Sequence, residues 1–259
     1  MIKTKVIGRV FRQDEIADQI YDMWIETELA QGARPGQFVC VYTKNAAALL
    51  PRPISICEVN EEKTMLRLVY RTVGTGTNEF AAYHAGTEIS LLGPLGNGFP
   101  VEKAAGKRVF LIGGGIGIPP MLQLSKEIKK AGQAYCELSV LGYRNELFLN
   151  TDLEKYSQVY VATEDGSAGT KGTVLDAIKE KGLSGDVIFA CGPMPMLRAI
   201  KEYAAANNME AYISLEEHMA CGVGACLGCV CKTKNVDAHS HVHNSRICTD
   251  GPVYNAEEV

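Results

Sequence analysis

Three cysteines lie within nine residues near the end of this chain, at Cys221, Cys226 and Cys229. Four residues separate the first pair, and two residues separate the second pair. Cys248 offers a fourth thiol further along the chain, and Cys231 is an alternative. This spacing is typical of plant-type [2Fe–2S] sites, whereas a zinc ribbon carries paired C-x-x-C motifs. The sequence therefore predicts that four thiolates hold an iron–sulfur cluster in this segment.

The residues between these cysteines are small, with Gly222, Gly224, Ala225 and Gly228 among them. A backbone that wraps closely around inorganic sulfide and turns its N–H groups inward leaves little room for larger side chains. The tail that contains them, residues 216–259, has only 44 residues and is too small to form a core without its metal. We therefore predict a small C-terminal cluster module over residues 216–259.

The composition is that of an ordinary globular protein, with 259 residues, 46% hydrophobic residues and a net charge of −4. This length accommodates two domains and a small appendage, and the weakly acidic balance gives no reason to expect nucleic acid as a partner. No apolar run approaches the ~20 residues of a membrane-spanning helix, and the first residues lack the apolar core of a signal peptide. We expect a cytoplasmic protein with no membrane partner, in which Cys40, Cys57 and Cys136 are buried thiols.

The first part of the chain, residues 1–102, alternates short strand-like segments with turns. A short helix is expected near residues 78–84. The expected strands lie near residues 3–11, 21–29, 36–42, 52–59, 64–71 and 87–93. This spacing is typical of an antiparallel β-barrel, which we predict for this domain.

Strands and helices alternate in the second part of the chain, residues 103–215. The expected strands lie near residues 107–114, 134–142, 158–165, 186–192 and 210–216. The expected helices lie near residues 120–130, 146–156, 173–181 and 193–207. Such alternation predicts an α/β domain in which helices cover a parallel sheet.

A glycine-rich turn follows the first strand of this α/β domain, with glycines at Gly113, Gly114, Gly115 and Gly117. Prolines then open a helix, a position that suits proline because its missing N–H would have no partner there. Glycines let the backbone approach a pyrophosphate, and the helix N-terminus adds positive potential. The turn is therefore a candidate binding site for a dinucleotide.

Two further loops in this domain have the character of nucleotide-binding loops. Cys191, Gly192 and Pro193 end a strand at the edge of the sheet where open α/β folds bind ligands, and a thiol there would face a nicotinamide. Glu164 and Asp165 end another strand. Carboxylates beside a ribose would repel a 2′-phosphate, so the sequence favours NAD over NADP without indicating which acid faces the ribose.

Several motifs occur in a fixed order along nearly the whole chain: RPISI, VYR, GTGT, GPLGNGF, GGGIGIPP, CGPMPML, EEHMACGVGACLGC and DGPVY. In this order they resemble the ferredoxin reductase-like flavoproteins, in which a barrel binds flavin and an α/β domain binds a pyridine nucleotide. Within that superfamily they resemble the electron-transfer subunits of NAD-dependent dihydroorotate dehydrogenase B. One departure is Ile54, which stands where an aromatic residue commonly lies against the flavin.

The resemblance implies sites on particular residues of this chain. By similarity, FAD would contact Arg52, Pro53, Ile54, Ser55, Val69, Tyr70, Arg71, Gly76 and Thr77. The cluster ligands would be Cys221, Cys226, Cys229 and Cys248, which decides against Cys231. The nucleotide would be NAD.

The resemblance also implies a partner and an electron path. A separate FMN-containing catalytic subunit would oxidise dihydroorotate to orotate in pyrimidine biosynthesis, in a heterotetramer with two copies of each chain. Electrons would pass from that FMN through [2Fe–2S] and FAD to NAD⁺. We name no general acid or base for this chain, since FAD converts between single electrons and hydride.

Other interpretations remain open from the sequence. A different reductase subunit of the same superfamily, such as that of a hydrogenase or sulfite reductase, would share these domains, and a non-enzymatic zinc protein would share the cysteines. His239, His241 and His243 alternate and would face one side of a strand as metal ligands, although an exposed hairpin is the favoured interpretation. His218 could lie near the flavin or the cluster.

Overall fold

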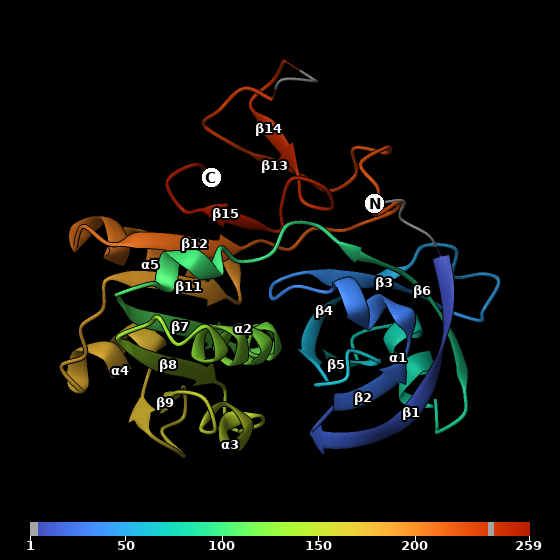
Figure 1. Ribbon diagram of the computed structural model, residues 1–259, viewed down its shortest axis with the longest axis horizontal. Coiled ribbons are helices and arrows are strands. Elements are labelled where there is room, and N and C mark those ends of the chain that lie inside the picture. The colour runs from blue at the N-terminus through green and yellow to red at the C-terminus, as the bar shows by residue number, and fades with distance from the viewer. Residues whose placement is uncertain (1–4, 238–240) are drawn as a thin grey trace. The chain divides into compact units, whose positions relative to one another are not determined.

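The computed structural model describes residues 5–237 and 241–259, and it divides into two compact units. One unit contains the chain up to Gly98 together with Glu216–Pro252. The other contains Phe99–Leu215 together with Val253–Glu258 (Figure 1). The expected domain boundaries, 1–102, 103–215 and 216–259, remain predictions about which segments bind which group. In packing terms most of the cysteine-rich tail belongs with the N-terminal unit.

The first unit is built on a closed antiparallel barrel with the strand order β1-β2-β5-β4-β3-β6, in which β6 pairs back onto β1. The strands are β1 (Lys5–Ala17), β2 (Ile20–Glu26), β3 (Phe38–Tyr42), β4 (Arg52–Val59), β5 (Met65–Arg71) and β6 (Glu88–Leu95). A 3-10 helix, η1 (Glu28–Gly32), and a short helix, α1 (Thr75–Ala81), complete it. The predicted barrel is therefore confirmed.

Apolar side chains that face inward from alternate positions of the strands fill the barrel. On β2, Met23 and Ile25 face inward, and on the paired strand β5, Leu66 and Leu68 do the same; all four are at most 1% exposed. Phe80 of α1 joins this core. Since successive residues of a strand face opposite sides, the sequence pattern that predicted the strands also determines which residues form the core.

The second unit contains a seven-stranded sheet with the order β10-β9-β8-β7-β11-β12-β15. Its strands are β7 (Arg108–Gly114), β8 (Cys136–Tyr143), β9 (Gln158–Thr163), β10 (Thr170–Lys171), β11 (Val187–Cys191), β12 (Glu210–Ser214) and β15 (Val253–Asn255). Only β15 is antiparallel to its neighbour. The central strands β7 and β11 are buried almost throughout, as expected when both faces of a parallel sheet are covered.

Helices connect these strands. They are α2 (Pro119–Ala131), α3 (Asn150–Leu153), α4 (Val174–Glu180) and α5 (Met194–Ala206), with 3-10 helices η2 (Val101–Ala104) and η3 (Gly115–Gly117). Proline residues occupy the first turn of α2, and Gly132 ends it with φ +63°, where its N–H donates to the carbonyl oxygens of Ile128 and Lys129. The sheet order reverses direction between β7 and β11, so these adjacent strands form the switch point at which open α/β sheets bind ligands.

The cysteine-rich tail has little regular structure. A small hairpin pairs β13 (Val230–Lys232) with β14 (Asn244–Arg246), and the last strand, β15, then extends the sheet of the second unit beside β12. The favoured interpretation of the histidine run as part of an exposed hairpin agrees with this for His241 and His243, which are both exposed. The expected alignment of three imidazoles includes His239, which lies outside the described residues.

Several predicted elements need correction. The helix expected over 146–156 is only α3, because Leu149 takes a left-handed conformation with φ +62° and breaks the backbone before Asn150. The helix expected over 78–84 lies at Thr75–Ala81. Cys40 and Cys57 are buried as expected, but Cys136 is only half-buried. Over the described part of the chain, no helix is long and apolar enough to span a membrane.

Candidate functional site

The four predicted cluster ligands come from two stretches of the first unit. Cys221, Cys226 and Cys229 lie in the irregular segment before β13, and Cys248 follows β14. The Ile247 N–H donates to the carbonyl oxygen of Cys229 at 2.9 Å, which ties the two stretches together. Burial, together with a hydrogen bond to the Cys229 thiol, raises the pKa of the Cys248 thiol to about 12. Cys229 and Cys248 are therefore neighbours deep in the segment.

Backbone N–H groups surround the more accessible thiols. The N–H groups of Val223 and Cys226 each lie 3.4 Å from the Cys221 sulfur, and the N–H of Gly228 lies 3.4 Å from the Cys226 sulfur. Burial raises the pKa of Cys221, but these N–H donors outweigh it and lower that pKa to about 6. Donors of this kind stabilise a thiolate, which is the form that binds metal.

Glycines shape the loop that carries Cys221 and Cys226. Gly222 has φ +69°, and a Cβ atom there would lie 3.0 Å from the Cys40 sulfur of β3 and 3.1 Å from Leu95 of β6. Gly224 has φ +82°, and its Cβ would lie 2.9 Å from Thr249. Both positions favour glycine for its backbone conformation and for close packing. The loop thus rests on the barrel with no space for larger residues.

These observations fit a [2Fe–2S] cluster. No three His, Cys, Asp or Glu side chains of the described residues converge closely enough to hold a single metal ion. A [2Fe–2S] cluster distributes four thiolates over two irons, so convergence on one point is not required. Cys231, the alternative ligand, lies on β13 opposite Ser245 of β14, whereas Cys248 contacts Cys229. The choice of Cys248 remains a prediction that this contact supports.

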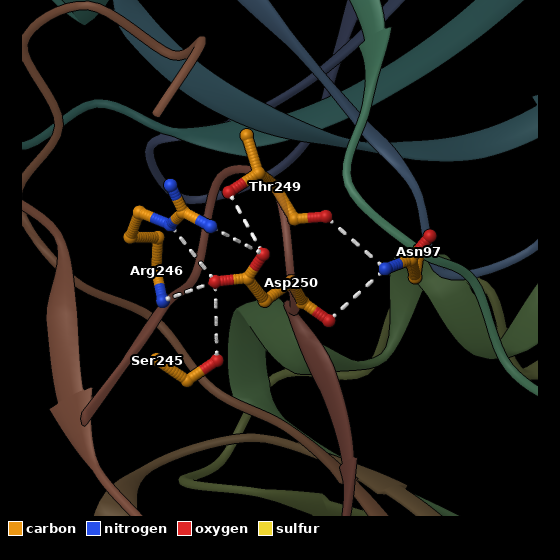
Figure 2. Close-up of polar contacts among 5 residues, drawn as sticks. All are labelled: Asn97, Ser245, Arg246, Thr249 and Asp250. Carbon is orange, nitrogen blue, oxygen red and sulfur yellow. Dashed lines mark hydrogen bonds and ion pairs between the residues drawn. The ribbon is translucent and has the colours of Figure 1, made fainter. Parts of the chain in front are cut away.

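A carboxylate organises the turn that contains Cys248 (Figure 2). Asp250 accepts hydrogen bonds from the Arg246 backbone N–H at 2.9 Å and from the Thr249 hydroxyl at 3.2 Å. The Arg246 guanidinium forms an ion pair with the same carboxylate at 3.0 Å, and Ser245 contacts it at 3.5 Å. The turn on which Cys248 lies is thereby closed on itself.

The residues expected at a flavin meet at one end of the barrel. Arg52–Ser55 open β4, Val69–Arg71 end the paired strand β5, and Gly76 and Thr77 lie in α1. The Arg52 guanidinium occupies the space beside Gly76, where a Cβ atom would overlap it. A guanidinium on a glycine-lined backbone suits a pyrophosphate, so the donors present fit this part of FAD.

Two of the expected flavin residues use their side chains elsewhere. The Tyr70 ring lies in the barrel core, 3% exposed, and its hydroxyl donates to Gln13 at 2.8 Å. The Thr77 hydroxyl accepts from the N–H of Val73 at 2.9 Å and so caps its own helix. Their predicted contacts with FAD remain predictions. Arg52 and Arg71 are the charged side chains left at this end of the barrel among the nine predicted residues.

The predicted nucleotide-binding glycines and the Cys191 loop lie side by side in the second unit. Cys191 pairs with Gly113 where β11 and β7 end. A Cβ atom on Gly117 would overlap the Cys191 carbonyl oxygen and lie 2.6 Å from the Gly192 nitrogen. A Cβ on Gly114 would lie 2.6 Å from the Met196 sulfur. The two loops therefore pack backbone to backbone at the switch point, a fit for a bound pyrophosphate.

The two acidic residues after β9 differ in what their side chains do. Asp165 accepts from the backbone N–H of Ser167 at 2.9 Å and from its hydroxyl at 2.7 Å, and these bonds lower the pKa of Asp165. Its carboxylate is thus used within its own turn. Glu164 is exposed. Of the two, Glu164 is the better candidate to meet a ribose.

Two family models match parts of the chain. The iron-sulfur cluster binding domain of dihydroorotate dehydrogenase B matches residues 216–259, and the oxidoreductase NAD-binding domain matches residues 111–202. The chain is 42% identical over 255 residues to the dihydroorotate dehydrogenase B (NAD(+)) electron transfer subunit of Geobacillus sp. (strain WCH70), with 96% of each chain covered. The chain belongs to this family.

Other relatives agree with the assignment to the dihydroorotate dehydrogenase B electron transfer subunits. The subunit of that name from Bacillus velezensis is 44% identical over 250 residues, which cover 95% of this chain and 94% of that one. Among solved structures, that of an NADH-dependent reduced ferredoxin-NADP oxidoreductase has a TM-score of 0.87 at 29% identity, covering 98% of this chain and 90% of that chain. A ferredoxin NADP+ reductase from Neisseria gonorrhoeae, at 16% identity and a TM-score of 0.66 over 79% of this chain and 91% of that chain, shows the shared fold alone.

Sequence reasoning missed three residues at the cluster segment. Cys40 was expected only as a buried thiol, yet its sulfur contacts the Gly222 loop. Asn97 and Asp250 lie inside the GPLGNGF and DGPVY motifs, which indicate the family resemblance but no contact with one another. The proximity of these two motifs depends on tertiary structure, and the order of motifs along the chain carries no signal of it.

Proposed function

We propose that this protein is the electron-transfer subunit of an NAD-dependent dihydroorotate dehydrogenase. It passes electrons from a separate catalytic subunit to NAD⁺ during pyrimidine synthesis. The single observation that carries the proposal is the cysteine segment, in which backbone N–H groups point at the thiols of Cys221 and Cys226. The glycine-lined switch point in the same chain supports it.

The proposal assigns a task to the main residues of each of the three predicted sites. Cys221, Cys226, Cys229 and Cys248 would hold the cluster. Arg52 and Gly76 would hold the flavin pyrophosphate, and Gly113 to Gly117 would admit the nucleotide. When bound, FAD would exchange a hydride with NAD and single electrons with the cluster, a conversion that neither NAD nor the cluster can perform alone. The protein thus contributes position and charge, and no general acid or base is required of it.

The proposal extends to the partner and the compartment. The catalytic subunit would carry FMN, and two copies of each chain would form the enzyme. A cytoplasmic location fits the proposed use of the cysteines, because four of the nine are assigned to a cluster, whereas disulfide-rich proteins belong to oxidising compartments.

A cofactor and activity assay tests this proposal. Protein purified without oxygen should contain about one FAD and about two irons per chain. It should oxidise NADH with an artificial acceptor, and dihydroorotate should leave its flavin oxidised until the FMN-bearing subunit is added. Zinc in place of iron would contradict the proposal, and so would reduction of the isolated chain by dihydroorotate. Coupling only to a different redox partner would place the protein among the other reductases of the superfamily.

Nucleotide preference should depend on Glu164. The wild-type protein should reduce its flavin faster with NADH than with NADPH, because the exposed carboxylate repels a 2′-phosphate. Glu164→Arg should lower the ratio of the NADH rate to the NADPH rate by about tenfold or more. A hydrogen bond to a charged group contributes roughly 1.5–3 kcal/mol, which corresponds to at least that factor. Stopped-flow flavin reduction with both nucleotides measures the ratio.

The matched control for this experiment is Asp165→Asn. Asparagine keeps an oxygen that can accept from Ser167, so the turn should persist and the NADH preference should change little. If wild-type protein prefers NADPH, or if Asp165→Asn alters the ratio as much as Glu164→Arg, the assignment of Glu164 is wrong.

A further inference from the structure

We propose that Asn97 is a positioning residue for the cluster ligand Cys248. Asn97 follows β6 at the end of the barrel, about 150 residues before that ligand in the sequence. The inference rests on the proposed function only in taking Cys248 as a cluster ligand. It assigns a role to the GPLGNGF motif, which the proposed function leaves without one.

The Asn97 amide bridges two consecutive carbonyl groups of the cysteine turn (Figure 2). Its Nδ2 donates to the Thr249 carbonyl oxygen at 3.1 Å and to the Asp250 carbonyl oxygen at 3.0 Å. Its backbone N–H donates to the Gly251 carbonyl oxygen at 2.6 Å, and Asn97 forms an isolated β-bridge with Pro252. One residue of the barrel thus holds four consecutive residues that directly follow Cys248.

The neighbouring glycine permits this approach. Gly96 has φ +73°, and a Cβ atom there would lie 2.6 Å from the Gly251 carbonyl oxygen and 2.6 Å from Pro252. A larger residue would push the turn away from the barrel. Gly96 and Asn97 of the GPLGNGF motif and Asp250–Pro252 of the DGPVY motif therefore form one close contact.

Cys248 is restrained on both sides by this arrangement. Before it, the Ile247 N–H is bonded to the carbonyl oxygen of Cys229. After it, the turn is closed by Asp250 and held by Asn97. Cys248 itself is 0% exposed, so protein atoms enclose it on every side. Asn97 is exposed, which means that the barrel core does not depend on its side chain.

Two substitutions separate hydrogen bonding from shape. Asn97→Ala removes both amide bonds, and Asn97→Asp keeps the size but replaces the Nδ2 group, with its two N–H donors, by one oxygen that faces both carbonyl groups. Both variants should fold with normal FAD content. Both should release cluster iron to a chelator about tenfold faster than wild-type protein, the effect of losing two exposed hydrogen bonds. The electron paramagnetic resonance spectrum of the reduced cluster should shift as well.

The matched control is Asn60→Ala. Asn60 also organises a turn of the first unit, accepting from the N–H groups of Thr64 and Met65 at 2.9 and 2.8 Å, but it lies between β4 and β5. Its loss should lower the melting temperature and leave iron release and the cluster spectrum unchanged. Equal iron release in Asn60→Ala, or wild-type release and spectrum in Asn97→Asp, would overturn the proposal. Iron content and spectra require no catalytic partner, so failure of the dihydroorotate assay alone would contradict only the proposed function.

Discussion

Replacing Cys226 by serine is expected to abolish dihydroorotate-dependent reduction of NAD⁺ by the complex with the catalytic subunit. Cys226 is exposed, and its sulfur accepts a hydrogen bond from the Gly228 N–H. Because its side chain lies outside the barrel core, the substitution should remove a cluster ligand without disturbing that core. Oxidation of NADH by an acceptor that takes electrons from FAD should be largely retained. The two activities, measured on one preparation with iron and FAD analysis, give the comparison.

The matched control for the cluster ligands is a pair of serine variants. Cys248→Ser should lose the cluster, since its thiol is buried against Cys229. Cys231→Ser should keep the cluster, because Cys231 lies on the hairpin strand β13. Equal iron loss in both variants would contradict the assignment of Cys248 as the fourth cluster ligand. Normal coupling in a cluster-free Cys226→Ser protein would show that electrons do not need the cluster.

Replacing Gly117 by alanine should have the second large effect, a loss of NADH-dependent flavin reduction. The added Cβ would overlap the Cys191 carbonyl oxygen and lie 2.6 Å from the Gly192 nitrogen. These are backbone atoms, which cannot rotate away as a side chain could, so the two nucleotide loops must separate. A displacement of about 1 Å at a binding site can cost roughly a hundredfold in rate. We expect a reduction of that order in stopped-flow measurements with NADH.

Gly182→Ala is the control for this variant. Gly182 lies in the same unit with φ +60°, but a Cβ there meets no atom within 4 Å. It should therefore incur only the modest strain of a left-handed backbone and leave NADH-dependent reduction near the wild-type rate. In Gly117→Ala, FAD and iron should remain bound, since both predicted sites lie in the other unit. If NADH reduces the flavin of Gly117→Ala at the wild-type rate, the close packing of these two loops is not required for NADH to bind and react.

Much of the fold could be predicted from the sequence because side-chain periodicity is a local signal. The expected strand at 52–59 is β4 with the same bounds, and 64–71 differs from β5 by one residue. The edge strands β10 and β15 were missed, since two or three residues carry no detectable alternation. The error at α3 came from Leu149, whose left-handed conformation is unusual for a leucine.

The candidate site also has features that could be predicted from the sequence and features that could not. Glycine turns and cysteine spacing are visible in the sequence because the backbone conformation demands particular residue types. The different use of Glu164 and Asp165 was not visible, because it depends on a turn through Ser167. Tyr70 remains a predicted flavin contact, and the sequence did not show that its ring packs in the core beside Phe80.

The cysteine-rich segment is one stretch of sequence, yet we do not expect it to fold correctly when it is transferred alone to another protein. Its loop fits over Cys40 and Leu95, its turn is bonded to Asn97, and its last residues extend the sheet beside β12. A hybrid joined at Leu215 would inherit the thiols while losing the surfaces shaped to receive them. Recombination among reductases should therefore preserve the tail together with β3, the end of β6 and β12.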